Sequence, residues 1–84
     1  MTKQVIVEVP EEALSVLREE PLQFARDMYE TAVVRWFQEG RVSQGQAAAM
    51  LGLRRGEFFD VLYAHRVSPI QMTGEELREE FRRA

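Results

Sequence analysis

Two adjacent arginines, Arg54 and Arg55, follow a glycine at position 52 and could bind a nucleic acid. A guanidinium group binds phosphate oxygens and can read guanine by donating two hydrogen bonds. Glutamine amides nearby could donate to the phosphate backbone, and a carboxylate could accept from cytosine N4. We therefore predict that five polar residues contact DNA: Gln44, Gln46, Arg54, Arg55 and Glu57. The alternative is a solvated helix start whose arginines have no target.

The element that must position these side chains is predicted over residues 43–67 as helix, tight turn and helix. A small residue stands where the helices would cross, a glycine follows four residues later, and apolar residues stand at buried spacings in the second helix. The residues that carry this pattern are Ala48, Gly52, Leu53, Phe58 and Val61. The spacing is typical of a helix-turn-helix, which places its second helix in the major groove. An αα-hairpin that packs a core and contacts no DNA would show the same spacing.

The N-terminal half predicts a strand and two helices. Residues 3–9 alternate in the manner of a half-buried strand, residues 11–17 look helical, and a helix over residues 22–38 follows Pro21 and ends at Gly40. Its apolar positions form one stripe at helical spacing: Leu22, Ala25, Met28, Tyr29, Ala32, Val33 and Trp36. The strand needs a partner, either the segment 67–72 or the same strand of a second copy. We favour the second copy, so the prediction is a mainly α (α+β) homodimer.

The last helix is expected after a capping box at residues 73–76. Leu77 and Phe81 are its large apolar residues, and we predict that they bind a partner protein. A solvated helix held by charge pairs is the alternative. We expect a single domain over residues 1–84, made of a dimerisation half (1–40), the helix-turn-helix (43–67) and this tail (68–84).

Composition narrows the class of protein. The chain of 84 residues has a formal charge of -3, while residues 43–67 hold three arginines and two acids, a net charge of +1. Non-specific attraction to phosphates should therefore be weak. With no cysteine and no run of ~20 apolar residues, we expect a cytoplasmic protein with no membrane segment. We expect no catalytic activity, cofactor, metal site or small-molecule ligand, because the sequence has no cysteine, no Ser/His/acid arrangement, no glycine-rich phosphate loop and no clustered metal ligands. Paired carboxylates such as Glu19 and Glu20 should lie on exposed helices, where nothing raises a pKa.

Several of these segments together resemble a known family. They are the strand ending at residues 7–10, the run 32–43, the block 45–53, residues 55–58 with Leu62, and an acidic tail. The resemblance is to small prokaryotic proteins, long catalogued as an uncharacterised family, that are read as helix-turn-helix antitoxins. Gly56 departs from the pattern, because the family often has tryptophan or another bulky residue there.

The resemblance implies an antitoxin of a type II toxin–antitoxin system. Such a protein would neutralise a toxin encoded beside it, often a PIN-domain ribonuclease, and would bind its own operator DNA. The competing interpretation is a protein-interaction module that uses the helical hairpin as a scaffold and binds no DNA.

Overall fold

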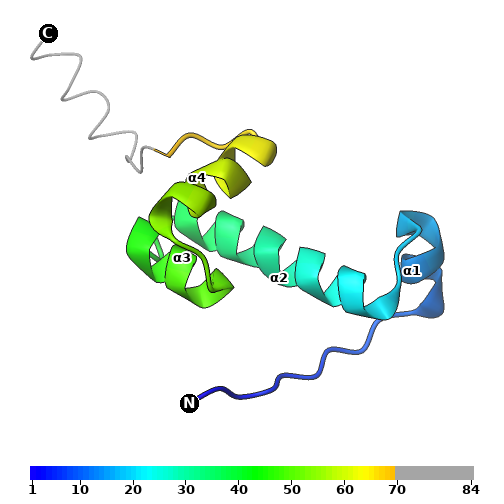
Figure 1. The fold of residues 1–84 in the computed structure, drawn as a ribbon. Helices are drawn as coiled ribbons and strands as arrows, with labels where there is room; N and C mark the ends of the chain where they lie inside the picture. Colours follow the sequence, from blue (N-terminus) through cyan, green and yellow to red (C-terminus); the bar gives the residue numbers. More distant parts are fainter. Residues whose placement is uncertain (70–84) are drawn as a thin grey trace, which may run out of the picture.

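The computed structural model describes residues 1–69, and this part of the chain contains four helices. They are α1 (Glu11–Leu17), α2 (Pro21–Gln38), α3 (Gln44–Leu51) and α4 (Arg55–Ala64). The long helix α2 has α1 at one end and the α3–α4 pair at the other (Figure 1). Residues 1–10 run back along α2 from α1 toward α3 (Figure 1).

The predicted N-terminal strand is wrong, and with it the α+β class. Residues 1–10 carry no regular secondary structure, and the described residues are helical wherever they are regular. No backbone group of residues 1–9 is hydrogen-bonded to the backbone of another described residue. Alternating apolar and polar side chains give the segment two different faces. A strand also needs a neighbouring strand to pair with its backbone hydrogen-bonding groups, and alternation does not supply one. Of the alternative partner segment, Val67 lies in an irregular stretch, and Ile70 and Met72 lie outside the described residues.

All four helices end in the same hydrogen-bonded turn. Just beyond each helix one residue adopts left-handed backbone geometry: Arg18 (φ 54°), Gly40 (φ 74°), Gly52 (φ 67°) and Arg66 (φ 57°). The residue after it donates a backbone hydrogen bond five residues back, as from Arg41 to Trp36 at 2.9 Å and from Val67 to Leu62 at 2.8 Å. This is the Schellman arrangement, which satisfies the last carbonyls of a helix.

The hydrophobic core lies between the C-terminal half of α2 and the pair α3–α4. Its fully buried side chains are Val33, Val34, Phe37, Ala47, Ala48, Phe58 and Leu62. The rings of Phe37 and Phe58 meet edge to face, with centroids 5.5 Å apart and planes at 86°. Edge-to-face contact is a favoured geometry for aromatic pairs, so this contact joins α2 to α4 directly.

Val33 is the one fully buried member of the predicted α2 stripe among the described residues, and Trp36, which is partly buried, packs against the core. Val33 is buried there together with Val34 and Phe37, whereas Ala25, Met28 and Tyr29 are exposed. The C-terminal half of α2 has two apolar faces, and spacing alone cannot decide which of them α3 and α4 cover. Within residues 1–69, no helix combines the length and hydropathy needed to cross a membrane.

Candidate nucleic-acid interface

The first helix of the predicted motif, α3, begins with a reciprocal cap. The Ser43 hydroxyl accepts a hydrogen bond from the Gln46 backbone N–H at 3.1 Å. The Gln46 side-chain oxygen accepts in turn from the Ser43 backbone N–H at 2.9 Å. Two backbone donors that would otherwise lack a helix partner are thereby satisfied. Gln46, predicted as a DNA contact, therefore uses its side-chain oxygen to hold the helix start, and the residue as a whole is exposed.

The turn between α3 and α4 is built on Gly52. Its φ of 67° ends α3, and Leu53 donates a backbone hydrogen bond to Ala48 at 2.9 Å. A side chain at such a φ is strained, because Cβ approaches the following carbonyl oxygen. The other residues predicted to form the motif surround this turn: Ala48 and Phe58 are buried, and Leu53 and Val61 are partly buried.

Glu57, in the first turn of α4, is hydrogen-bonded to Arg54, the residue directly before that helix. Its Oε1 accepts from the Arg54 backbone N–H at 2.9 Å and from Arg54 Nε at 3.2 Å. These two hydrogen bonds, the backbone one first, lower the pKa of Glu57 below its ordinary value of 4.5. The carboxylate therefore caps α4 and orients Arg54. This use competes with the predicted contact to cytosine.

The Arg54 side chain remains open to solvent. Its relative exposure is 89%, and within the described residues only its Nε is engaged in an ion pair. Its two terminal nitrogens are thus available for a planar, bidentate contact of the kind that arginine makes with phosphate or guanine. Arg54 is the best-placed group of the predicted set for an external anion.

Gln44 joins three parts of the chain that are distant in sequence. Its Oε1 accepts from Arg55 Nη2 at 3.3 Å, and its Nε2 donates to the Pro69 backbone carbonyl at 2.6 Å. Both ends of the amide are therefore used, and Gln44 positions Arg55 beside the start of α3. The sequence places Gln44 near a phosphate. Local sequence patterns do not indicate hydrogen bonds from Gln44 to residues 11 and 25 positions away.

Four of the five predicted DNA contacts therefore form two bonded pairs. Gln44 contacts Arg55, and Glu57 contacts Arg54, whereas Gln46 bonds only within its own helix cap. Both arginines lie at the N-terminal end of α4, where the helix dipole adds positive potential. The arrangement presents two guanidinium groups from one helix start.

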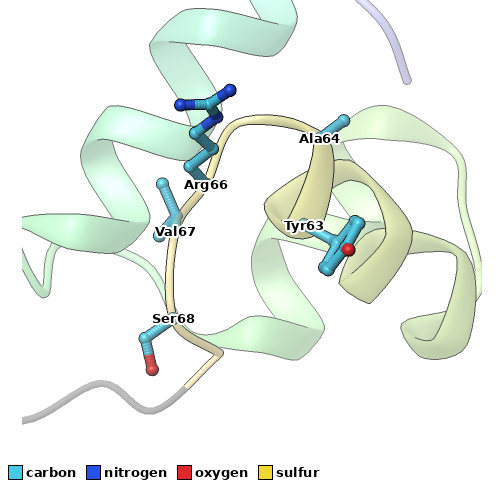
Figure 2. Close-up of a pocket in the computed structure, with 5 residues that line it drawn as sticks. All are labelled: Tyr63, Ala64, Arg66, Val67 and Ser68. Carbon is cyan, nitrogen blue, oxygen red and sulfur yellow. The ribbon is translucent and has the colours of Figure 1, made fainter.

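A shallow hollow of about 600 Å³ lies where the chain leaves α4, lined by Tyr63, Ala64, Arg66, Val67 and Ser68. In Figure 2 the Tyr63 ring projects from α4, and the chain turns at Arg66 toward Ser68. The ring is 86% exposed. The hollow adjoins the start of the predicted partner-binding tail, whose Leu77 and Phe81 lie outside the described residues.

Other titratable groups serve the scaffold. His65 Nε2 lies 2.9 Å from Glu30 Oε2, which ties the end of α4 to the middle of α2. Glu19 differs from the expectation, because a hydrogen bond between its carboxyl group and that of Asp27 raises the pKa of Glu19 and lowers that of Asp27. Among residues 1–69, no cluster of three or more His, Cys, Asp or Glu side chains could hold a metal ion.

Comparison with known proteins gives one result at the level of the family. A model of the uncharacterised protein family UPF0175 matches residues 1–84. The chain belongs to this family. No curated protein and no solved structure matches the chain. The resemblance to a small uncharacterised family is thus confirmed at the level of the family, and the antitoxin role stays a prediction.

Proposed function

We propose that this UPF0175 protein is the antitoxin of a type II toxin–antitoxin system. In this proposal α3, the Gly52 turn and α4 bind operator DNA, and the tail with Leu77 and Phe81 binds the toxin. The resemblance described above suggests a PIN-domain ribonuclease as that toxin. The observation that carries the DNA half of the proposal is the pair of arginines at the start of α4, directly after the left-handed turn.

The exposed face of α4 supports a role as a recognition helix. In helix-turn-helix proteins the N-terminal residues of the second helix contact base edges. Here that end carries Arg54, which is open to solvent, and Arg55, which is held by Gln44. Farther along the same helix Phe59 and Tyr63 are 41% and 86% exposed, so apolar surface is available for contact with thymine methyl groups or the backbone.

Each polar residue then has a separate role. Arg54 contacts a phosphate or a guanine, Glu57 holds Arg54 in place, and Arg55 contacts the backbone from a position fixed by Gln44. Gln46 donates from its amide NH₂. The net charge of -3 means that affinity must come from these local contacts more than from long-range attraction.

The decisive experiment is a salt series. Binding of the protein to the promoter of its own operon is measured by fluorescence anisotropy between 50 and 200 mM salt, for wild type and Arg54→Ala/Arg55→Ala. If both arginines contact phosphates, the slope of log K against log salt falls by about 1.8, since each contact contributes about 0.9. Arg26→Ala/Arg35→Ala on α2 is the control, because it removes the same charge elsewhere. An unchanged slope in the first variant contradicts the DNA proposal.

A protein-interaction module without DNA binding is the second candidate. Its supporting observations are the net charge of -3 and the hollow beside Tyr63, which adjoins the tail. Under this alternative the promoter is not bound at any salt concentration, while a partner protein still forms a stoichiometric complex. The same binding series therefore separates the two candidates.

A further inference from the structure

The N-terminal segment and α2 enclose an apolar groove that the core does not use. Its volume is about 920 Å³. One wall is the N-terminal segment, through Thr2, Lys3, Val5, Ile6, Val7 and Val9. The other is the predicted stripe of α2, including Ala25, Met28, Tyr29 and Trp36. No residue before Val33 is fully buried in the described part of the chain. The groove therefore lies on a half of the molecule that has apolar side chains and no core of its own.

The amount of apolar surface matches one side of a stable protein interface. Val5, Ile6, Val7, Val9, Met28 and Tyr29 are between 37% and 89% exposed. At roughly 100 Å² of apolar surface for each fully exposed side chain, they present about 350 Å². A standard interface buries about 800 Å² on each partner, of which roughly 450 Å² is apolar. Ala25, Trp36 and Met50 also line the groove and contribute toward the remainder.

Charges at the two ends of the groove have opposite signs. Glu20 directly precedes Pro21, and Glu11 lies one helical turn before Leu14, so both acids adjoin groove residues at the α1 end. At the other end the Arg41 guanidinium lies 5.9 Å from the centre of the Trp36 ring and 3.8 Å from Glu39 Oε1. Glu39 also pairs with Arg35 at 3.2 Å, so two arginines share one carboxylate and this end keeps a net positive charge. Two copies packed antiparallel would place each acidic end beside a basic end. A parallel arrangement would bring like charges together.

We propose that a second copy of this chain occupies the groove, with the two α2 helices antiparallel around a two-fold axis. The midpoint between Pro21 and Trp36 falls between Met28 and Tyr29, so these residues meet at the axis. Trp36 and Arg41 of one copy then lie beside Pro21 and Glu20 of the other. A two-fold interface needs one self-complementary surface, and this face supplies both an apolar centre and opposite charges. The interface uses α2 side chains and requires no strand.

The proposal does not depend on the proposed function, because it can be measured without DNA or toxin. Sedimentation equilibrium of the full chain at 1–50 µM should give twice the monomer mass of 9.8 kDa. Ala25→Glu places a charge at the apolar centre and should weaken dimerisation at least tenfold. Thr31→Glu is the matched control, since Thr31 is exposed on α2 and does not line the groove. Circular dichroism checks that both variants keep their helices.

The orientation has its own test. Glu20→Arg and Arg41→Glu should each weaken dimerisation, and the double reversal should restore it. The chain has no cysteine, so Ala25→Cys and Ala32→Cys can be introduced singly. A mixture of these variants should form a disulfide-linked dimer, because residues 25 and 32 are placed symmetrically about the axis. Thr31→Cys should not.

Three results would overturn the inference. The first is a wild-type monomer at 50 µM. The second is a dimer whose affinity Ala25→Glu leaves unchanged. The third is a double reversal, Glu20→Arg with Arg41→Glu, that fails to restore dimerisation, which would refute the antiparallel orientation.

Discussion

Replacing Gly52 by alanine tests whether backbone geometry at the turn holds the α3–α4 pair. A Cβ added at Gly52 would have no heavy atom within 4 Å, so no clash opposes the substitution. The cost comes from φ alone, which is 67°. A residue with a Cβ in this region destabilises the folded state by about 1–2 kcal/mol. Replacing glycine by alanine also makes the unfolded chain less flexible, which stabilises the protein by about 0.4–1 kcal/mol. We expect Gly52→Ala to lower the free energy of unfolding by about 0.5–1 kcal/mol.

Gly56→Ala is the matched control, since the chemical change is identical and a Cβ there also has no heavy atom within 4 Å. Gly56 lies inside α4, where alanine is favoured by up to about 1 kcal/mol. The two variants should therefore shift stability in opposite directions and differ by about 1–2 kcal/mol. Urea unfolding followed by circular dichroism, at one protein concentration, measures both. For a domain of this size each 1 kcal/mol corresponds to about 4–8 °C in Tm.

The reasoning fails if Gly52→Ala is as stable as wild type or more stable. It also fails if both alanine variants are destabilised equally. Backbone conformation would then not decide whether a glycine-to-alanine change raises or lowers the free energy of unfolding.

Two further predictions concern the cap of α4 and the tail. Because hydrogen bonds from Arg54 lower the pKa of Glu57, the stability they contribute is complete above pH 4.5 and is lost as the pH falls through the lower folded pKa. Wild type should therefore be more stable than Glu57→Gln near neutral pH. Unfolding measured between about pH 3 and pH 6 should show the difference in unfolding free energy between the two proteins shrinking as the pH falls. A difference that stays constant over this range would contradict the assignment. Removing residues 73–84 should abolish toxin neutralisation in a growth assay and leave the sedimenting mass that of a dimer. Full neutralisation by the truncated chain would refute the tail assignment.

The sequence predicts the helices well because each has local signals. Pro21 and Ser43 mark helix starts, Gly40 and Gly52 mark helix ends, and the structure has helices at these bounds. Arg18 and Arg66 adopt the same left-handed geometry without a glycine, so residue type gives no sign of their turns.

Contacts between distant residues are the part that local patterns cannot supply. Alternation over residues 3–9 predicts a strand, but a strand also needs a partner, and none is present in the described residues. The predicted apolar stripe of α2 reaches the core only through Val33 and Trp36, whereas Val34 and Phe37, which the stripe did not include, are buried there as well. In the candidate interface, residue types correctly draw attention to Arg54 and Arg55. The bonds that engage Gln44 and Glu57 emerge only from the folded arrangement.

The position of the buried side chains along the sequence has a consequence for how the chain folds. In the described residues, 1–69, all seven come from residues 33–62, a continuous stretch of the sequence. Such a unit closes only short loops as it folds, which favours rapid folding. The first 32 residues contribute no fully buried side chain to this core, so we expect substitutions at their exposed positions to disturb it less than substitutions within residues 33–62. Exposed positions in that half can therefore be varied to alter its surface while the end that carries Arg54 and Arg55 keeps its architecture.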